Sequence, residues 1–492
     1  MTNSLQEQPK EKRISKVLKE NVQNIEKEFG KTNDLSIRQL NQQQSGTNIA
    51  IIHLSGIVDE KSLNEHIIEP IIQLMKTSNN QLSPSDLEGS IFNTIEVSDI
   101  SFATDWEQLL SSILIGDTVI LLDNIPKAII AGTQKIESRS ITEPTSQTVI
   151  RGPKDSFNEN IRQNISLVRS RIQNTNIRIW SSKVGTITKT EVAVMYLEGV
   201  TEKKYVDEIV ERIETIDIDG VLESNYIEEL IQDHKKTLFP LLLNTERPDV
   251  VVANLLEGKI AIFIHGTPFV LICPITFIQF FQSPEDYYNN YVYSTFLRML
   301  RVGAFLVNMY ATAIYLALIT HHQGLIPTTL LVSIMAQRER IPFPAVIEIL
   351  MMEVAFEVLR EAGIRMPRAI GPAVSIVGAL ILGQAAVEAG FVSAAVVIIV
   401  ATSAISSFTL PNTSIVNVAR GLRFFLLFSS AFIGLFGVLL MSLAILLHLC
   451  SLRSFGISYL TPYAPFSLKE QKDSLFRFSF PVLRRKSSSK KN

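Results

Sequence analysis

The sequence predicts an α+β membrane protein in which a duplicated cytoplasmic α/β module, thioredoxin-like in outline, is followed by an α-helical transmembrane domain of about four to five spans. Three observations lead to this fold class. Most charged residues precede Arg301, whereas the long apolar runs follow it. Two stretches of the first half align with each other. Several apolar runs of the second half approach the roughly 20 residues that a helix needs to cross a bilayer.

The composition argues against several classes of protein. A formal net charge of -2 is unlike that of a nucleic-acid-binding protein, which normally presents a basic face. The two cysteines, Cys273 and Cys450, are too few for a disulfide framework. Residues 1–54 lack the apolar core of a secretory signal peptide, so we expect the first half of the chain to stay in the cytoplasm.

The first half begins with a polar stretch and becomes apolar at Asn48. Residues 1–47 are predicted to be a flexible polar N-terminal tail that contains one short helix near residues 16–29. From Asn48 the run IAIIHLSG predicts a strand, and apolar residues recur at helical spacing just after it. We therefore place a first cytoplasmic α/β subdomain at residues 48–142.

An internal duplication produces a second copy of this subdomain. Residues 50–63 align with residues 193–206 without a gap, and residues 115–130 align with residues 257–272 at nearly the same offset. Each copy reads as a strand, two helices and a hairpin whose turn carries DNIP or HGTP, which predicts a mixed sheet covered by helices. The sequence has no CxxC motif, so we expect no redox chemistry.

The second copy defines a cytoplasmic α/β subdomain at residues 189–281. Residues 143–188, between the two copies, are predicted to be a linker with a connecting helix after Asp155. Apolar residues from Phe157 to Val168 recur there at helical spacing.

The second half is predicted to be a helical transmembrane domain at residues 282–450, followed by a basic cytoplasmic tail at residues 451–492. Aromatic residues just before Arg301 suit the headgroup level of a membrane, and residues 302–320 predict the first span. Residues 369–411 contain two apolar runs that turn at Gly390. A last long run covers residues 424–449.

Two further segments leave the number of spans open. Residues 325–337 are apolar but short for a crossing, and residues 344–359 read as an amphipathic helix. Four full spans keep both ends of the chain in the cytoplasm, as the positive-inside rule favours for the basic tail, with residues 325–359 partly buried in the membrane. Counting residues 325–337 as a fifth crossing places the following arginines inside but exports the tail.

Polar side chains within the apolar runs are candidates for an ion path, because such groups at membrane depth are costly unless they face protein or water. The alternatives are hydrogen bonds back to the same helix for the hydroxyls, and solvation, arginine pairing or an acid–base role for the glutamates. The candidates are Gln384, Glu388, Thr402, Ser403, Ser406, Ser407, Asn412, Glu353 and Glu357. Glu348 has apolar neighbours on its helix face, so we expect it to form an intramembrane charge pair with Arg338 or Arg340.

Motifs for catalysis or cofactor binding are absent from the sequence. It contains no GxxxxGK[ST] loop, no HExxH motif and no Cys/His cluster with metal-binding spacing. We therefore expect a protein that is not an enzyme and that has no catalytic residue, cofactor or metal site.

A series of long motifs runs through the chain from about Asn48 to the C-terminal tail. They are EP at residues 143–144, RGPKDSF at residues 151–157, SPEDYY at residues 283–288, the stretch at residues 343–371, SIVGALILGQAAVEAG at residues 375–390 and SYLTPYAPF at residues 458–466. In sequence and in order, these motifs resemble those of the GerA family, the A-type subunits of spore germinant receptors.

The resemblance implies a multi-pass subunit in the inner membrane of the bacterial endospore, with its N-terminal domain on the cytoplasmic, spore-core side. It implies partnership with a B-type integral membrane subunit and a C-type lipoprotein of the same receptor, and a homo-oligomer embedded in membrane lipid. Such an oligomer would be a ligand-gated channel that releases monovalent cations when a nutrient binds, lined by the ion-path candidates. The family also contains a spore paralogue outside the receptors.

Two other classes of function stay open. A signalling scaffold would couple a nutrient-binding partner subunit to downstream germination proteins. A solute transporter would show an inverted repeat within the membrane half. The repeat visible here is direct and lies in the soluble half, which counts against the transporter.

Overall fold

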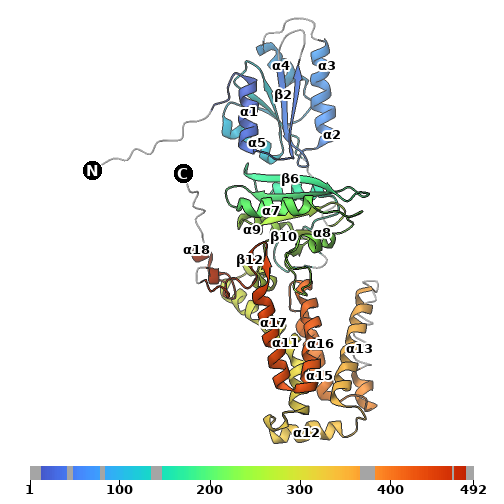
Figure 1. The fold of residues 1–492 in the computed structure, drawn as a ribbon. Helices are drawn as coiled ribbons and strands as arrows, with labels where there is room; N and C mark the ends of the chain where they lie inside the picture. Colours follow the sequence, from blue (N-terminus) through green and yellow to red (C-terminus); the bar gives the residue numbers. More distant parts are fainter. Residues whose placement is uncertain are drawn as a thin grey trace, which may run out of the picture.

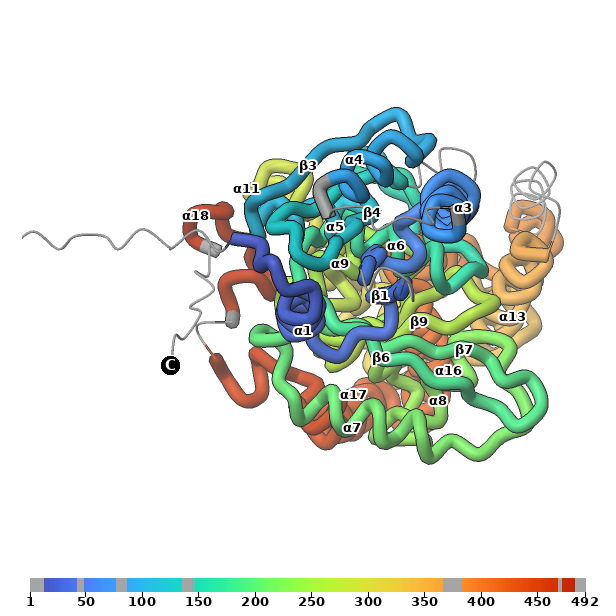
Figure 2. Tube along the Cα trace, turned by 90° about the horizontal axis from the view of Figure 1, so that it is seen from above, coloured from blue at the N-terminus to red at the C-terminus, as the bar shows by residue number. Residues whose placement is uncertain are grey.

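The computed structural model describes residues 13–41, 48–77, 84–134, 144, 147–365, 383–467 and 470–483. The chain forms three parts along one long axis (Figure 1). Module 1, residues 13–134, lies at one end, module 2, residues 147–281, lies in the middle, and the helical region, residues 291–451, forms the other end. Seen down that axis, the modules lie above most of the helices, and helix α13 stands at the edge (Figure 2).

Module 1 is a five-stranded antiparallel sheet with helices on both faces. The strand order is β1-β2-β4-β5-β3, and every neighbouring pair is antiparallel. Helices α1 and α5 cover one face, and the helices from α2 to α4 cover the other. The elements are α1 (Leu18–Phe29), β1 (Leu35–Asn41), β2 (Asn48–Leu54), α2 (Glu60–Leu63), η1 (Asn64–Ile68), α3 (Glu69–Thr77), α4 (Pro84–Thr94), β3 (Ile100–Ala103), α5 (Trp106–Ile115), β4 (Thr118–Leu122) and β5 (Ala128–Ala131).

Module 2 repeats this strand topology. Its strand order is β6-β7-β9-β10-β8, again antiparallel throughout. The elements are α6 (Ile161–Arg169), β6 (Ile177–Val184), β7 (Thr190–Leu197), α7 (Lys203–Glu214), α8 (Ser224–Ile231), β8 (Leu243–Thr245), α9 (Pro248–Leu256), β9 (Ile260–Ile264) and β10 (Val270–Cys273). The duplicated unit therefore includes the α1–β1 and α6–β6 pairs, which the sequence alignment did not reach.

The repeat requires the same glycine at the same turn in both modules. Gly116 and Gly258, which follow α5 and α9, have φ values of 109° and 87°. A Cβ at either position would lie 2.9 Å from a backbone oxygen, that of Ile57 in module 1 and that of Val200 in module 2. A residue with a side chain is thus excluded by both conformation and space.

Three sequence-based expectations need correction. The predicted mixed, thioredoxin-like sheet is wrong, because all paired strands are antiparallel. Residues 1–47 are not a tail throughout, since α1 buries Leu18, Val22 and Ile25, and β1 pairs with β2 along its length. The predicted linker at residues 143–188 contains α6 and β6, which are integral parts of module 2.

A buried ion pair joins the two modules. Asp34 precedes β1 of module 1, and Arg169 ends α6 of module 2. Arg169 donates from Nε to Asp34 Oδ2 at 2.8 Å and from Nη2 to Asp34 Oδ1 at 3.0 Å. The arginine side chain is only 2% exposed, so this bidentate pair lies out of contact with water. The backbone N–H of Asn33 also donates to the Ile179 carbonyl at 3.1 Å, which extends the junction.

The helical region begins with the 30-residue helix α11, and its described residues contain five further α-helices. These are α11 (Tyr291–Thr320), α12 (Thr328–Arg338), α13 (Ala345–Arg365), α15 (Ala394–Ser407), α16 (Thr413–Ile433) and α17 (Leu435–Ser451). Within the described residues, α11 and α16 are long and apolar enough to span a membrane, and α15 and α17 are shorter apolar helices. The predicted span at residues 302–320 lies within α11. Most of the first run of the 369–411 pair falls outside the described residues.

The predicted last span is a helical hairpin. The run at residues 424–449 is interrupted at Gly434, where φ is 67°, and α17 packs back against α16. The Ser429 hydroxyl donates to the Gly437 carbonyl at 2.8 Å. A Cβ on Gly437 would lie 2.3 Å from the Ser429 carbonyl oxygen, so glycine is what permits the close return. Helix α12, the predicted short segment, lies across the end of the helical region far from the modules (Figure 1).

The chain after α17 returns to module 2. A short hairpin of β11 (Arg453–Ser454) and β12 (Ile457–Ser458) follows α17. The Ser454 hydroxyl donates to the Leu241 carbonyl at 2.7 Å, and the Tyr459 hydroxyl donates to the Pro240 carbonyl at 2.7 Å. The helical region therefore starts and ends at the face of module 2.

One buried carboxyl of module 2 has an unusual pKa. Burial, reinforced by the negative charge of Glu223, raises the pKa of Glu228 from 4.5 to about 7. Between these two values the folded module holds a proton that the unfolded chain has released, so stability decreases as pH rises.

We expect removal of one partner from the module junction to destabilise the packing of module 1 on module 2. D34N leaves Arg169 buried without its counter-charge, at a cost of about 3 kcal/mol. The double variant D34L/R169M buries no charge and should lose less than D34N. Hydrogen exchange of β1 and β6 in the purified full chain measures the effect, and a double variant that exchanges faster than D34N would contradict the explanation.

We also expect module 2 to lose stability between about pH 5 and pH 8, by on the order of 2 kcal/mol. E228Q should flatten this dependence, because glutamine has no proton to release. E229Q, which changes the exposed neighbouring carboxyl, is the matched control and should keep the wild-type profile. Hydrogen exchange of β9 and β10 across the pH range gives the measurement, and an unchanged slope in E228Q would refute the assignment.

Candidate functional site in the helical region

The strongest concentration of buried charge in the described helical region lies where four helices meet. Arg423 of α16 is its centre, and its side chain is 4% exposed. Glu353 of α13, Ser403 of α15 and Asn308 of α11 surround it, and all three are fully buried. We call these residues, together with Arg420 and Glu357, the buried charge cluster.

Arg423 connects α16 to both α13 and α15. Its Nη2 lies 2.9 Å from Glu353 Oε2 and 3.1 Å from Glu357 Oε1. Its Nη1 donates to the Ser403 hydroxyl at 3.0 Å. A single guanidinium thus contacts two carboxylates on successive turns of α13 and a hydroxyl of α15.

Arg420 completes the charge balance. It lies one turn before Arg423 and donates from Nε to Glu357 Oε1 at 2.9 Å, and its Nη2 also contacts Glu357. Two arginines then face two glutamates. A charge in an apolar environment costs several kcal/mol unless it is paired, so the balance is what allows these residues at this depth.

Ser403 and Asn308 extend the cluster to the first helix. The Ser403 hydroxyl donates to the Asn308 carbonyl at 2.9 Å, and Asn308 Nδ2 donates to the Ser403 carbonyl at 3.2 Å. This reciprocal pair fixes α15 against α11. The cluster thereby connects α11, α13, α15 and α16, and its chemistry is that of a polar cross-link between helices.

Glu348 forms a second buried polar contact in the first turn of α13. Its Oε1 accepts from the Ser393 backbone N–H at 2.6 Å and from the Ser393 hydroxyl at 2.5 Å. Ser393 is the N-cap of α15, so the carboxylate lies at the positive end of that helix. Arg338 Nε lies 3.5 Å from Glu348 Oε2, whereas Arg340 is exposed. Of the two partners considered from the sequence, the structure brings Arg338 to Glu348.

The remaining ion-path candidates separate into two groups. Thr402, Ser406 and Ser407 donate to carbonyls of their own helix, at 2.8, 2.8 and 2.6 Å. Thr402 is nevertheless exposed on the outer face of α15. Gln384 and Glu388 are also exposed, and the Gln384 amide donates to the Glu388 carboxylate at 2.9 Å.

Asn412, another of the ion-path candidates, caps a helix. It is the N-cap of α16, where its side chain accepts from the Ser414 N–H at 2.8 Å. The structure therefore brings Glu353, Glu357 and Ser403 together, but it places Gln384, Glu388 and Thr402 on an outer surface.

The sequence reasoning missed Arg420, Arg423 and Asn308. All three lie inside apolar stretches, which is itself a signal, since charged residues within membrane helices need a partner. The signal was lost because the last span was taken to begin at Phe424, which left both arginines outside it.

Comparison with known proteins identifies the family. The model of the Bacillus/Clostridium GerA spore germination protein family matches residues 23–489. The chain belongs to this family.

Its relatives cover nearly its full length. Spore germination protein KA of Bacillus subtilis (strain 168) is 46% identical over 94% of this chain and 85% of the relative. Spore germination protein GerLA of Bacillus cereus is 38% identical over 94% of this chain and 93% of the relative. The uncharacterized membrane protein YfkQ of Bacillus subtilis (strain 168) is 42% identical over 94% of this chain and 89% of the relative.

A solved structure is also similar. The crystal structure of the N-terminal domain of the A subunit of the Bacillus megaterium spore germinant receptor GerK3 is 35% identical, with a TM-score of 0.43, and the match covers 55% of this chain and all of that chain.

This chain is accordingly a membrane protein of the GerA spore germination family. Among its described residues, no group of three or more His, Cys, Asp or Glu side chains could hold a metal ion. The buried charge cluster is therefore described by its ion pairs and hydrogen bonds alone.

We expect R423Q to destabilise this GerA-family protein by about 3 to 5 kcal/mol, because Glu353 then stays buried without its counter-charge. E353Q/R423Q should be milder than R423Q, since it leaves fewer unpaired charges. R365Q is the matched control, because it removes an arginine at the end of α13 that is 78% exposed. The melting midpoint of the purified chain in detergent measures the effect, and equal losses in R423Q and R365Q would contradict the assignment.

Proposed function

We propose that this chain is an A subunit that triggers germination by assembling with copies of itself into a nutrient-gated pore, which releases monovalent cations from the spore core. The observation that carries the proposal is the outer polar row, defined as Gln384, Glu388, Thr402 and Ser406. In the described single chain, Gln384, Glu388 and Thr402 are exposed and Ser406 is half-buried.

The position of the outer polar row is unfavourable for an isolated subunit. Thr402 shares its exposed face of α15 with Ile398, which is 65% exposed, and Ile405, which is 64% exposed. The apolar residues suit lipid or a protein neighbour, whereas a carboxylate and an amide at membrane depth require water or a polar partner. Copies of the chain arranged around an axis would turn the row into rings of polar groups around a water-filled path.

The buried charge cluster has a different role in this proposal. Glu353, Glu357 and Ser403 are engaged with arginines of the same chain, so they are less suited to an ion path than the outer polar row. They hold α13 and α15 in register with α11 and α16. The cluster would thus hold the helices in place beside the path, and its own side chains would not line the path.

Membership of the family supports a proposal for the partners and the location. The nutrient would bind a B-type integral membrane subunit, a C-type lipoprotein would complete the receptor, and the whole would lie in the inner membrane of the endospore. Both modules would then face the spore core, on the same side as the C-terminal segment that returns to module 2. The proposed activity is conduction and not an enzymatic reaction.

A signalling scaffold is the second candidate. The two stacked modules, which extend well away from the helical region, favour it because they offer surfaces for further germination proteins (Figure 1). The number of A subunits in the purified receptor distinguishes the two. A homo-oligomer with an axial pore supports conduction, whereas a strict monomer in the complex supports the scaffold.

We expect T402L to slow the nutrient-triggered release of monovalent cations from spores by at least about tenfold, because leucine narrows the path and removes a hydroxyl. I398L, on the same exposed face, is the matched control and should leave the rate within about twofold. Immunoblotting of the A subunit verifies equal amounts of protein. If T402L, S406L and E388L all release cations at the wild-type rate, the outer polar row does not line the path.

A further inference from the structure

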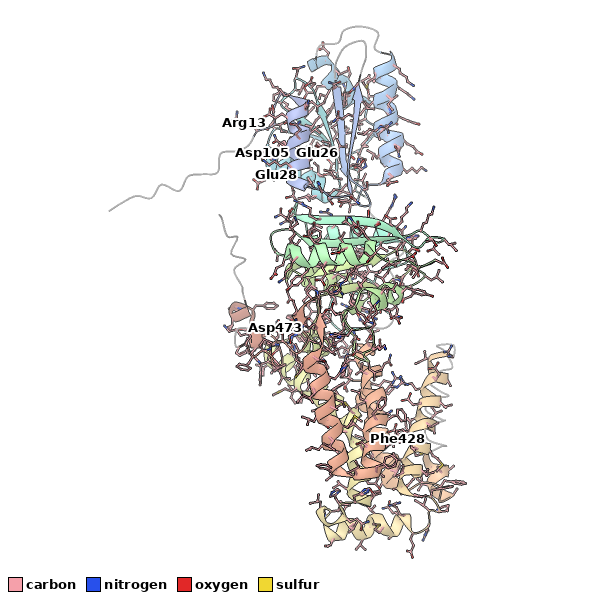
Figure 3. All side chains as sticks on the ribbon, in the orientation of Figure 1. Arg13, Glu26, Glu28, Asp105, Phe428 and Asp473 are labelled. Atoms are coloured by element: carbon pink, nitrogen blue, oxygen red, sulfur yellow. The ribbon has the colours of Figure 1, made fainter. Side chains whose placement is uncertain are left out.

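The C-terminal segment at residues 470–483 packs against the start of α11, beside the SPEDYY motif. The Arg477 backbone N–H donates to the Thr295 hydroxyl at 3.1 Å, and that hydroxyl lies 3.2 Å from the Arg477 carbonyl. Asp473, in the same segment, lies at the junction between module 2 and the helices (Figure 3). This is the level at which α11 leaves module 2 and enters the helical region.

Two arginines at this junction have carboxylate partners. Arg298 donates from Nε to Asp286 Oδ2 at 2.8 Å and from Nη1 to Asp473 Oδ1 at 2.9 Å. Arg301 donates from Nη1 to Asp286 Oδ1 at 2.8 Å. The two positive charges of Arg298 and Arg301 are therefore balanced by the two negative charges of Asp286 and Asp473.

Arg477 has no such balance. It is 4% exposed, yet its Nε and Nη2 have no hydrogen-bond partner within the described part of the chain. No ion pair joins it to a carboxylate whose side chain the structure describes, and Asp473, its partner in a β-bridge, is engaged by Arg298 at 2.9 Å. A buried cation with unsatisfied donors costs several kcal/mol, so an anion that accepts from Nε and Nη2 of Arg477 would stabilise this position.

The guanidinium of Arg477 lies between two aromatic rings. Its Cζ is 5.6 Å from the ring centroid of Tyr287 and 4.7 Å from that of Phe480. Phe480 is itself 60% exposed, so the cover over Arg477 is a surface side chain. A ligand that reaches the guanidinium from this side would displace the Phe480 ring.

Exposed aromatic residues surround this position. Phe476 is 46% exposed and Phe478 is 45% exposed, on either side of the buried Arg477. Tyr291, Tyr293 and Phe296 in the first turns of α11 are 44%, 55% and 60% exposed. Aromatic side chains of this kind prefer the headgroup level of a bilayer, where one part of the ring is apolar and the other is hydrated.

We propose that Arg477 binds the phosphate of an anionic phospholipid headgroup, while Phe476, Phe478 and Phe480 insert beside it into the membrane surface. The phosphate oxygens would accept hydrogen bonds from Nε and Nη2 of Arg477, which have no acceptor among the described residues. The choice of a lipid over free phosphate follows from the exposed aromatic residues, which a soluble anion would leave in water. The basic sequence at residues 484–491 adds attraction toward an anionic surface.

This lipid site anchors the C-terminal segment to the membrane on the side of the modules. Because Asp473 of the same segment pairs with Arg298, the headgroup and α11 are connected by two adjacent contacts. The inference depends on the membrane placement of α11 and is independent of whether the chain forms a pore.

The test uses the full chain purified in detergent, with short-chain phosphatidylglycerol, short-chain phosphatidylcholine and inorganic phosphate as three separate probes. We expect phosphatidylglycerol to raise the melting midpoint of the wild type more than either other probe. R477Q should weaken the apparent affinity for phosphatidylglycerol by about 5- to 10-fold. R453Q removes an exposed arginine of β11 at the same end of the helical region and should retain the wild-type affinity.

Each other outcome overturns the proposal. Equal stabilisation by inorganic phosphate would assign the site to a free anion, and equal losses in R477Q and R453Q would indicate diffuse surface charge. If R477Q does not fold, native mass spectrometry of the wild type in mixed phosphatidylglycerol and phosphatidylcholine decides the matter. Retained lipid without preference for phosphatidylglycerol would refute the site.

Discussion

The contact of Arg423 with Glu353 is the constraint on which the arrangement of the helical region depends. Apolar surfaces give little preference for one helix packing over another when the solvent is itself apolar. A buried guanidinium is different, because it has one set of acceptors and a large penalty in any arrangement that separates it from them. Since those acceptors come from α13 and α15, the position of Arg423 on α16 determines where these helices can lie.

The same physical solution recurs along the whole chain. Asp34 and Arg169 join module 1 to module 2, and Asp286, in the stretch between module 2 and α11, pairs with Arg298 and Arg301 of α11. Each of these contacts buries complementary charges at a boundary between two parts of the fold. Such pairs add little net stability compared with an apolar core, but they discriminate strongly against misplaced neighbours. The long axis of the molecule is therefore assembled from specific contacts between otherwise separate units.

Part of this structure could be predicted from the sequence, whereas the rest depends on contacts between residues that are far apart in the chain. The duplication could be predicted because two stretches of each module align at nearly the same offset, and Gly116 and Gly258, which lie within them, occupy turns that only glycine fits. Strand β1 was missed because it is a polar edge strand, without the alternation that marks a half-buried one. Gly434 was taken as an ordinary glycine of a membrane helix, where small residues are common. The partners of Glu353 lie more than sixty positions away, which no local pattern could specify.

The β11–β12 hairpin, which follows the last helix, brings the chain back to module 2. Helix α11 begins shortly after module 2, and the chain that follows α17 is hydrogen-bonded to module 2. Module 2 is therefore connected to both the first and the last helix of the region. The intervening helices are linked to it along the chain only through those two. A small rotation of module 2 would therefore move α11 and α17 together. The displacement would reach α13 and α15 through the side chains that couple them to α11 and α16.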